Sequence, residues 1–174
     1  MNKIILALNK MLNEFDYSVK TEQDKKRYRL KTPFEFLKSK SGVCWDYADY
    51  VAHTIPKSEF YFICDQEINN THTFVIYPEK GKWYWFESSW KSRAGVYEYS
   101  SKKECLDDIT KKFLDDLETP AKSWCLLTKP NYTNGYIPYG KGAVQYIKWV
   151  ILNFEFADGD KDLHEDFKKY AREV

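Results

Sequence analysis

The sequence lacks the features that mark several common classes of protein. Its 27 Lys and Arg residues almost balance its 26 Asp and Glu residues, which leaves a formal charge of +1. A dedicated nucleic-acid binder normally carries a basic face and a high pI, so this charge argues against that class. Four cysteines are too few for a disulfide scaffold, and no two of them are spaced CxxC as in a structural zinc site. We therefore expect no nucleic-acid partner, no metal and no cofactor.

Long apolar runs and internal divisions are also missing. The longest apolar run near the start spans residues 4–8, whereas a signal-peptide core needs about 7–15 residues and a membrane span about 20. No repeat, low-complexity tract or Pro/Gly-rich linker divides the chain. A length of 174 residues fits one domain with one substantial core. We expect a single domain over 1–174, no membrane segment, a cytoplasmic location and reduced thiols.

Aromatic residues are abundant, at 18% of the chain. Aromatic rings fill cores, and they also line clefts that grip extended or ring-bearing ligands. We expect Trp45, Trp85 and Trp90 to form core or cleft wall, and they are our candidate substrate contacts. The tyrosine-rich loop over residues 129–142 is read as either a lid over a site or a packed connector.

The hydrophobic pattern changes period along the chain, and the change predicts both helices and strands. Segments with helical spacing alternate with segments that read as antiparallel strands, which indicates an α+β fold in which a helix packs on an antiparallel sheet. The expected helices are 3–15, 42–55, 101–117 and 160–172, with a short helical turn that Thr32 and Pro33 open. Residues 143–156 are apolar nearly all round and fit a helix or a strand, and we favour a helix. The expected strands are 60–64, 72–77, 83–87 and 123–128.

The helix expected over 42–55 places a cysteine in its first turn. Either Ser41 or Gly42 is expected to cap this helix. Cys44 then lies where unpaired backbone N–H groups and the helix dipole favour negative charge. A thiol is a useful nucleophile only as the thiolate, so Cys44 is the candidate nucleophile. Asp46 and Asp49 are expected to complement the helix start or to face solvent.

Only three histidines are available as a base for this thiol. His53 lies nine residues further along the same helix, about 13 Å away at about 1.5 Å per residue. His164 falls in a charged terminal helix, where we expect it to be solvated. His72 begins a predicted strand and is therefore the candidate base.

An acidic residue is expected to orient that histidine. Because side chains alternate along a strand, a hairpin loop with an even number of residues places His72 and Glu87 on one face of the sheet. A four-residue loop over 79–82 sets Phe74 opposite Glu87 and His72 on the diagonal, whereas a six-residue loop sets His72 directly opposite Glu87. An odd loop would separate them and remove the triad.

Three blocks of sequence resemble a known family. Residues 32–37 (TPFEFL) and 41–48 (SGVCWDYA) resemble the segment leading into the nucleophile helix of the transglutaminase-like group within the papain-like thiol enzymes. Residues 71–75 (THTFV) resemble the histidine strand of that family, and residues 83–90 (WYWFESSW) resemble the strand that follows it. The resemblance covers about residues 32–90. It departs from the family pattern at Glu87, where the family usually has Asp.

The resemblance implies a papain-like core in which Cys44 is the nucleophile, His72 the general base and acid, and Glu87 the residue that orients the ring. It implies acyl transfer on amide bonds of a protein or peptide, and we expect hydrolysis. Transglutaminase-type transamidation, an acetyl transfer like that of arylamine N-acetyltransferases, and an inactive binding or assembly module on the same fold are the alternatives. The remaining cysteines, Cys64, Cys105 and Cys125, are expected to be buried and inert.

Overall fold

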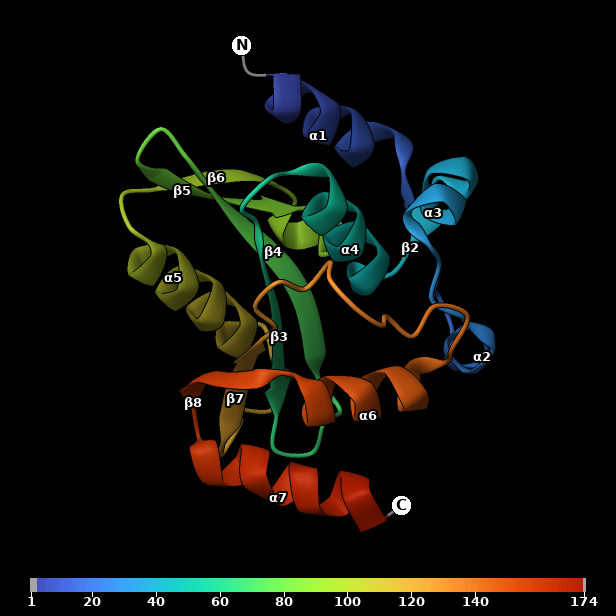
Figure 1. The fold of residues 1–174 in the computed structure, drawn as a ribbon, viewed down its shortest axis with the longest axis vertical. Coiled ribbons are helices and arrows are strands. Elements are labelled where there is room, and N and C mark those ends of the chain that lie inside the picture. Colours follow the sequence, from blue (N-terminus) through green and yellow to red (C-terminus); the bar gives the residue numbers. More distant parts are fainter. Residues whose placement is uncertain (1–2, 174) are drawn as a thin grey trace.

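The computed structural model describes the backbone of residues 3–173 and the side chains of residues 8–173. Its helices are α1 (Lys3–Glu14), α2 (Glu22–Arg27), α3 (Pro33–Ser39), α4 (Cys44–Thr54), α5 (Lys102–Asp115), α6 (Ala143–Asn153) and α7 (Lys161–Glu173), with a 3₁₀ turn η1 (Lys91–Arg93). Its strands are β1 (Asp16–Tyr17), β2 (Ser41–Gly42), β3 (Glu59–Asp65), β4 (Thr71–Glu79), β5 (Lys82–Glu87), β6 (Gly95–Tyr99), β7 (Trp124–Thr128) and β8 (Glu155–Gly159). The predicted α+β fold with an antiparallel sheet is confirmed (Figure 1).

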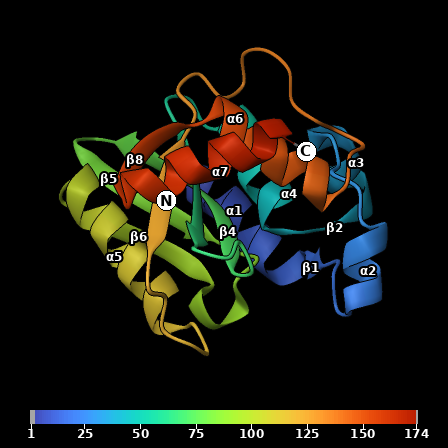
Figure 2. The ribbon, with the colours of Figure 1, turned by 90° about the horizontal axis from the view of Figure 1, so that it is seen from below.

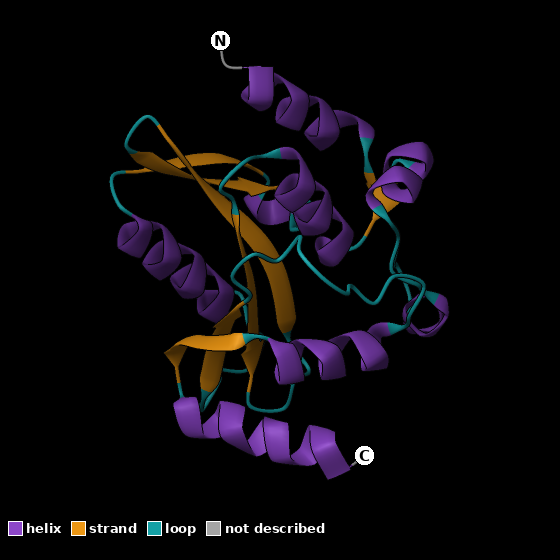
Figure 3. Ribbon diagram, in the orientation of Figure 1, coloured by secondary structure: helices purple, strands orange, loops and turns teal. Residues whose placement is uncertain are grey.

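Six strands form one antiparallel sheet in the order β6-β5-β4-β3-β7-β8. Helices lie on both sides of this sheet (Figure 3). Alternation along the strands sends side chains to two separate cores, as expected for a sheet covered on both faces. In β3, Phe60 and Phe62 join the core beneath α4 and α6, whereas Tyr61 and Ile63 join the core beneath α5. The sheet is thus the middle of three layers.

The turn between β4 and β5 fixes the register on which the predicted site depends. Lys80 and Gly81 have φ values of 49° and 79°, and two consecutive residues with positive φ are typical of a tight hairpin turn. The backbone pairs run from Glu79–Lys82 to Ile76–Trp85. This is the register that we predicted from a four-residue loop, although the turn itself is shorter.

The sequence pattern missed several short strands. The helix predicted over 143–156 ends at Asn153, and Glu155 begins β8 at one edge of the sheet. The pattern also missed β6, which forms the opposite edge, and the parallel pair β1–β2. The two-residue strands β1 and β2 are too short for a period to be recognised. The five-residue edge strands β6 and β8 bury too few side chains to give a clear apolar pattern. Within residues 3–173, no helix has the length and apolar character needed to cross a bilayer.

Candidate active site

Cys44 is the first residue of α4, and its side chain is partly exposed. The N-cap is Val43, so the expectation that Ser41 or Gly42 would cap the helix is wrong. The reason lies at Asp46, whose carboxylate reaches back and accepts a hydrogen bond of 2.8 Å from the Val43 backbone N–H. The cap is therefore supplied from inside the helix, and Cys44 lies one position closer to its start than a cap at Gly42 would place it.

Gly42 is required by a close approach of two side chains. A Cβ atom at this position would lie 2.8 Å from the Cβ of Asp46 and 2.8 Å from Cε2 of Phe36. Both distances are shorter than a carbon contact allows. Glycine in the Gly-Val-Cys block therefore lets the chain pass between Phe36 and Asp46 and enter α4 at Cys44.

Asp46 is buried and connects the helix start to a segment before it. Its carboxylate accepts a hydrogen bond from the Tyr28 hydroxyl and one of 2.9 Å from the Lys31 backbone N–H. Burial raises the pKa of Asp46, and these hydrogen bonds partly oppose the rise. Asp46 therefore complements the helix start, which is one of its two predicted roles, and it does not face solvent.

His72 and Glu87 form a buried pair between β4 and β5. The His72 Nε2 atom lies 2.6 Å from Glu87 Oε2. Both residues lie beyond the last backbone pair of the two strands, Ile76–Trp85, and continuing that register sets Phe74 opposite Glu87 and His72 on the diagonal. The side-chain contact therefore bridges the strands where backbone pairing has stopped.

The second oxygen of Glu87 is held by the turn that follows β5. Oε1 accepts hydrogen bonds of 2.8 Å from the Ser89 backbone N–H, the Ser89 hydroxyl and the Trp90 backbone N–H. A glutamate is one methylene longer than the aspartate of the family pattern. The three donors hold that longer side chain in one orientation and point Oε2 at the imidazole.

The electrostatics of the pair favour the imidazolium. Burial alone lowers the pKa of His72, but the Glu87 charge and hydrogen bonds with Cys44 and Glu87 outweigh it and raise the pKa to about 10. Burial also raises the pKa of Glu87, but the His72 charge and hydrogen bond leave it below its usual value. Cys44 lies close enough to His72 to act on its pKa, and the two side chains line the same cavity, so the three predicted residues form one cluster.

Two aromatic rings flank the imidazole. The ring centroid of Trp90 lies 5.3 Å from that of His72 in an edge-on arrangement, and the ring of Phe74 lies 6.1 Å away, nearly parallel. These rings exclude water from the His72–Glu87 contact. A low local dielectric strengthens a hydrogen bond between charged partners.

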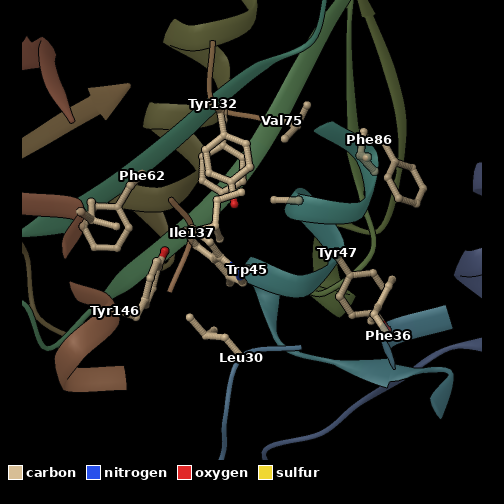
Figure 4. Close-up of a cluster of buried hydrophobic side chains, with 14 of the residues drawn as sticks. Leu30, Phe36, Trp45, Tyr47, Phe62, Val75, Phe86, Tyr132, Ile137 and Tyr146 are labelled. Atoms are coloured by element: carbon tan, nitrogen blue, oxygen red, sulfur yellow. The ribbon is translucent and has the colours of Figure 1, made fainter. Parts of the chain in front are cut away.

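Cys44 and His72 open onto a cavity of about 540 Å³, a volume within the usual range for ligand sites. Of the three predicted substrate contacts, Trp90 lines it. Trp45 also borders the cavity, but its side chain is completely buried. Figure 4 shows it among Tyr146, Leu30 and Ile137. Trp85 does not line this cavity. It stacks on Tyr97 in the core beneath α5, because its strand position faces that helix. Trp85 is therefore a core residue, which is one of the two places expected for it.

Tyr17 is a site residue that sequence reasoning missed. Pairing of β1 with β2 sets Tyr17 beside Gly42, and the side chain lines the cavity together with Cys44. Burial and the neighbouring Cys44 raise the pKa of Tyr17, partly opposed by the hydrogen bond that its oxygen accepts from the Cys44 backbone N–H. A two-residue strand leaves no periodic signal, so the sequence could not place Tyr17 here.

The other histidines lie outside this cluster. His53 contacts Asp49 on its own helix, with Nδ1 3.5 Å from Oδ1. His164 is completely buried, and its Nε2 lies 3.2 Å from the Ile151 carbonyl oxygen. The expectation of a solvated His164 is wrong because α7 packs on α6 and turns this ring inward. Burial accordingly lowers the pKa of His164.

Asp49 also departs from expectation, since it neither caps the helix nor faces solvent. It is completely buried and accepts hydrogen bonds from the hydroxyls of Tyr132 (2.6 Å) and Tyr139 (3.0 Å). These contacts fasten the 129–142 loop to α4. Of the two interpretations of that loop, the packed connector is the one observed.

Cys64, Cys105 and Cys125 are completely buried, as predicted. Cys64 and Cys125 face each other across β3 and β7 with their sulfur atoms 3.6 Å apart, and both are free thiols. Among the described residues, no group of three or more His, Cys, Asp or Glu side chains could hold a metal ion.

Comparisons with known proteins add no family to this description. No protein-family model matches the chain. The search of curated proteins likewise found no match. The candidate site therefore rests on its own geometry.

Proposed function

We propose that this protein is a cysteine-dependent acyl-transfer enzyme that hydrolyses amide bonds of a protein or peptide, on a core like that of the transglutaminase-like group of papain-like enzymes. Cys44 is the nucleophile, and His72 accepts and donates the proton. Glu87 orients the imidazole ring and stabilises its positive charge. One observation carries the proposal. The Cys44 thiol, at the start of α4, shares a cavity with His72, and the Nε2 atom of this histidine lies 2.6 Å from the buried carboxylate of Glu87.

The proposed reaction begins when the Cys44 sulfur attacks the amide carbonyl carbon, after its proton has passed to His72. Because Nε2 is engaged by Glu87, the proton is carried on Nδ1. The imidazolium then donates that proton to the departing amine as the C–N bond breaks, which leaves a thioester on Cys44. Water, deprotonated by His72, attacks the thioester, and the acid is released with the thiol restored.

The negative charge on the carbonyl oxygen needs hydrogen-bond donors in the tetrahedral intermediate. The backbone N–H of Cys44 lies in the first turn of α4, where N–H groups have no partner within the helix. In the structure the Tyr17 oxygen lies beside this N–H. A substrate oxygen that displaces the Tyr17 oxygen from this N–H would meet the tyrosine hydroxyl as a second donor.

The test uses iodoacetamide, which alkylates thiolates. The three other thiols are buried. Preferential alkylation of Cys44 over them would therefore report only that Cys44 is more exposed, and not that it is more reactive. The informative measurement is the Cys44 rate constant at pH 6 against that of glutathione, followed by peptide mass spectrometry. We expect Cys44 to react at least about tenfold faster than glutathione and to lose this advantage in His72→Ala, which removes a ring and opens the site further.

A second measurement addresses acyl transfer itself. p-Nitrophenyl acetate should release about one equivalent of nitrophenol in a burst and leave an acetyl group on Cys44, detected by mass. Faster loss of that acetyl group to added amine than to water would favour transamidation over hydrolysis. Alkylation of Cys44 no faster than glutathione, unchanged in His72→Ala, would leave the inactive binding module as the function of this fold.

A further inference from the structure

The cavity around Cys44 has a lining with a distinct chemical character. Beyond the reacting residues, its lining includes aliphatic or phenyl side chains from several parts of the chain: Val19, Leu30, Val43, Ile68, Phe113, Leu117 and Ile147. The lining also contains three charged side chains: Glu22 and Lys25 on α2, and Asp116, the residue that follows α5. In the view from below, β4 lies between α5 and α2 (Figure 2).

Asp116 is already engaged. Its carboxylate forms an ion pair of 2.7 Å with Arg93, so it is not available as a counter-charge for a ligand. Of the charged residues in this lining, Glu22 and Lys25 on α2 could still pair with a charged ligand group. Against Ile68, Phe113 and Leu117 such a group would lose its hydration without gaining a counter-charge. The part of the cavity formed by Ile68, Phe113 and Leu117 is thus suited to uncharged, apolar groups.

Ile68, in the turn between β3 and β4, has an unusual backbone conformation for its residue type. Its φ angle is 55°, in the left-handed region that β-branched residues avoid and that glycine or asparagine adopt more readily. Its side chain is half-buried and lines the cavity. The turn would form more easily with glycine, so the turn itself gives no reason for isoleucine at this position.

The neighbouring carboxylate of Asp65 holds the turn in this conformation. Oδ1 accepts hydrogen bonds from the backbone N–H groups of Glu67, Asn69 and Asn70, and Oδ2 accepts one of 2.7 Å from the Asn70 side chain. Asp65 is itself buried. A strained conformation that the surroundings enforce is a feature of ligand-contacting sites, and here it fixes an apolar side chain in the cavity that Cys44 opens onto.

We propose that Ile68 is a specificity-determining residue and that the substrates are peptides with a bulky, uncharged apolar side chain next to the reacting amide. This side chain occupies the apolar lining to which Ile68, Phe113 and Leu117 contribute. The inference rests on the proposed function of Cys44 and adds the substrate class. The strain at Ile68 is retained because the turn must present an aliphatic side chain rather than only reverse the chain.

The test compares reagents that differ only in the group attached to a common reactive end. Cys44 is alkylated with iodoacetamide and with its N-(2-phenylethyl), N-(2-ammonioethyl) and N-(2-carboxyethyl) derivatives, and each rate constant is divided by that for glutathione. We expect the phenylethyl reagent to exceed iodoacetamide by about tenfold or more, the range that apolar pockets supply. The two charged reagents should show no gain.

Ile68→Gly tests the residue, and Lys57→Gly is the matched control. Lys57 is also a non-glycine residue with positive φ, 62°, but it is exposed and lies outside the cavity lining. Both variants should keep or raise the melting temperature, because glycine relieves the backbone strain. We expect only Ile68→Gly to lose the phenylethyl gain, and Ile68→Asn, which also tolerates this conformation, should lose it as well.

The outcomes separate the two proposals. If plain iodoacetamide labels Cys44 no faster than glutathione, the proposed function fails. If that labelling is fast but the phenylethyl group gives no gain, or the gain survives in Ile68→Gly, the proposed substrate class is overturned while the function stands.

Discussion

Two buried carboxylates in this chain each face a histidine, and their pKa values move in opposite directions. Burial raises the pKa of Glu87, yet the charge and hydrogen bond of His72 leave it below its usual value. At Asp49, burial prevails over hydrogen bonds from Tyr132 and Tyr139 and over the charge of His53, and the pKa rises to about 6. The two acids are comparably enclosed but differ in their partners.

Geometry explains the difference. His72 is itself buried and lies 2.6 Å from Glu87, whereas His53 is partly exposed and lies 3.5 Å from Asp49. A charge in direct contact and away from water offsets the loss of hydration, whereas hydroxyl dipoles and a screened charge offset it only in part. The His72–Glu87 pair in the cavity therefore retains its charges. On α4, Asp49 instead serves to bind the tyrosine hydroxyls of the 129–142 loop.

The largest effect is expected when the charge is removed from each acid in turn. Glu87→Gln should lower the pKa of His72 by about 1–3 units from its value of about 10, because the carboxylate charge that stabilises the imidazolium is gone. Acylation of Cys44 should fall by about 10²–10⁴-fold. Histidine-ring NMR titration and the p-nitrophenyl acetate burst measure these changes. Asp49→Asn, the matched control, should leave the pKa of His72 and the acylation rate of Cys44 unchanged.

The same shift predicts a pH limit for amide substrates. The imidazolium that protonates the leaving amine is lost as pH rises through about 10. Turnover of an amide should therefore decline above about pH 10 in the wild type and at lower pH in Glu87→Gln. An alkaline limit that does not move in this variant would show that Glu87 does not set the charge of His72.

The tyrosines near the two regions provide the next comparison. Tyr17→Phe removes the hydroxyl beside the Cys44 N–H and should slow acylation by about 10²-fold, the effect of losing one oxyanion donor. Alkylation by iodoacetamide forms no oxyanion, so its rate should change by less than about twofold if Tyr17 acts only there. Tyr139→Phe removes a hydrogen bond to Asp49 and should lower the free energy of unfolding by about 1–2 kcal/mol without slowing acylation. Equal acylation rates in the two variants would remove Tyr17 from the mechanism.

Stability against pH should separate the acids themselves. Because the folded pKa of Asp49 is raised from 3.8 to about 6, its contribution to stability is complete below pH 3.8 and is lost as pH rises through 6. The folded pKa of Glu87 is lowered from 4.5, so its contribution is present above pH 4.5 and is lost on further acidification. The free energy of unfolding should be measured with urea from pH 3 to 8. Asp49→Asn should remove the loss of stability as pH rises through 6, and Glu87→Gln should remove the loss below pH 4.5.

The smallest effect is expected at His53. The ring is partly exposed and its contact with Asp49 is 3.5 Å long, and ion pairs of this kind contribute less than about 1 kcal/mol. His53→Ala should therefore change the free energy of unfolding by less than that amount and leave the Cys44 rates unchanged. A loss as large as that in Tyr139→Phe would mean that His53 holds Asp49 as firmly as Tyr139 does.

Much of the site could be predicted because its residues lie on elements with clear periods. The helical stripe around Cys44 placed it at a helix start, and alternation along β4 and β5 placed His72 and Glu87 on one face. The errors lie where packing overrides the local pattern. His164 is buried where α7 packs on α6, and Asp49 is buried by a loop whose sequence carries no period.

The sequence by itself determined the longer helices and the four central strands of the sheet, β3, β4, β5 and β7, because hydrophobic periodicity is set by which side chains must leave water. It also determined which thiol begins a helix and which histidine shares a strand face with an acid. Only the tertiary structure decided what meets those groups: Tyr17 beside the Cys44 N–H, the turn donors on Glu87, and the strained Ile68 in the same cavity. These contacts join segments far apart in the chain, and their geometry depends on how whole layers pack rather than on any local pattern.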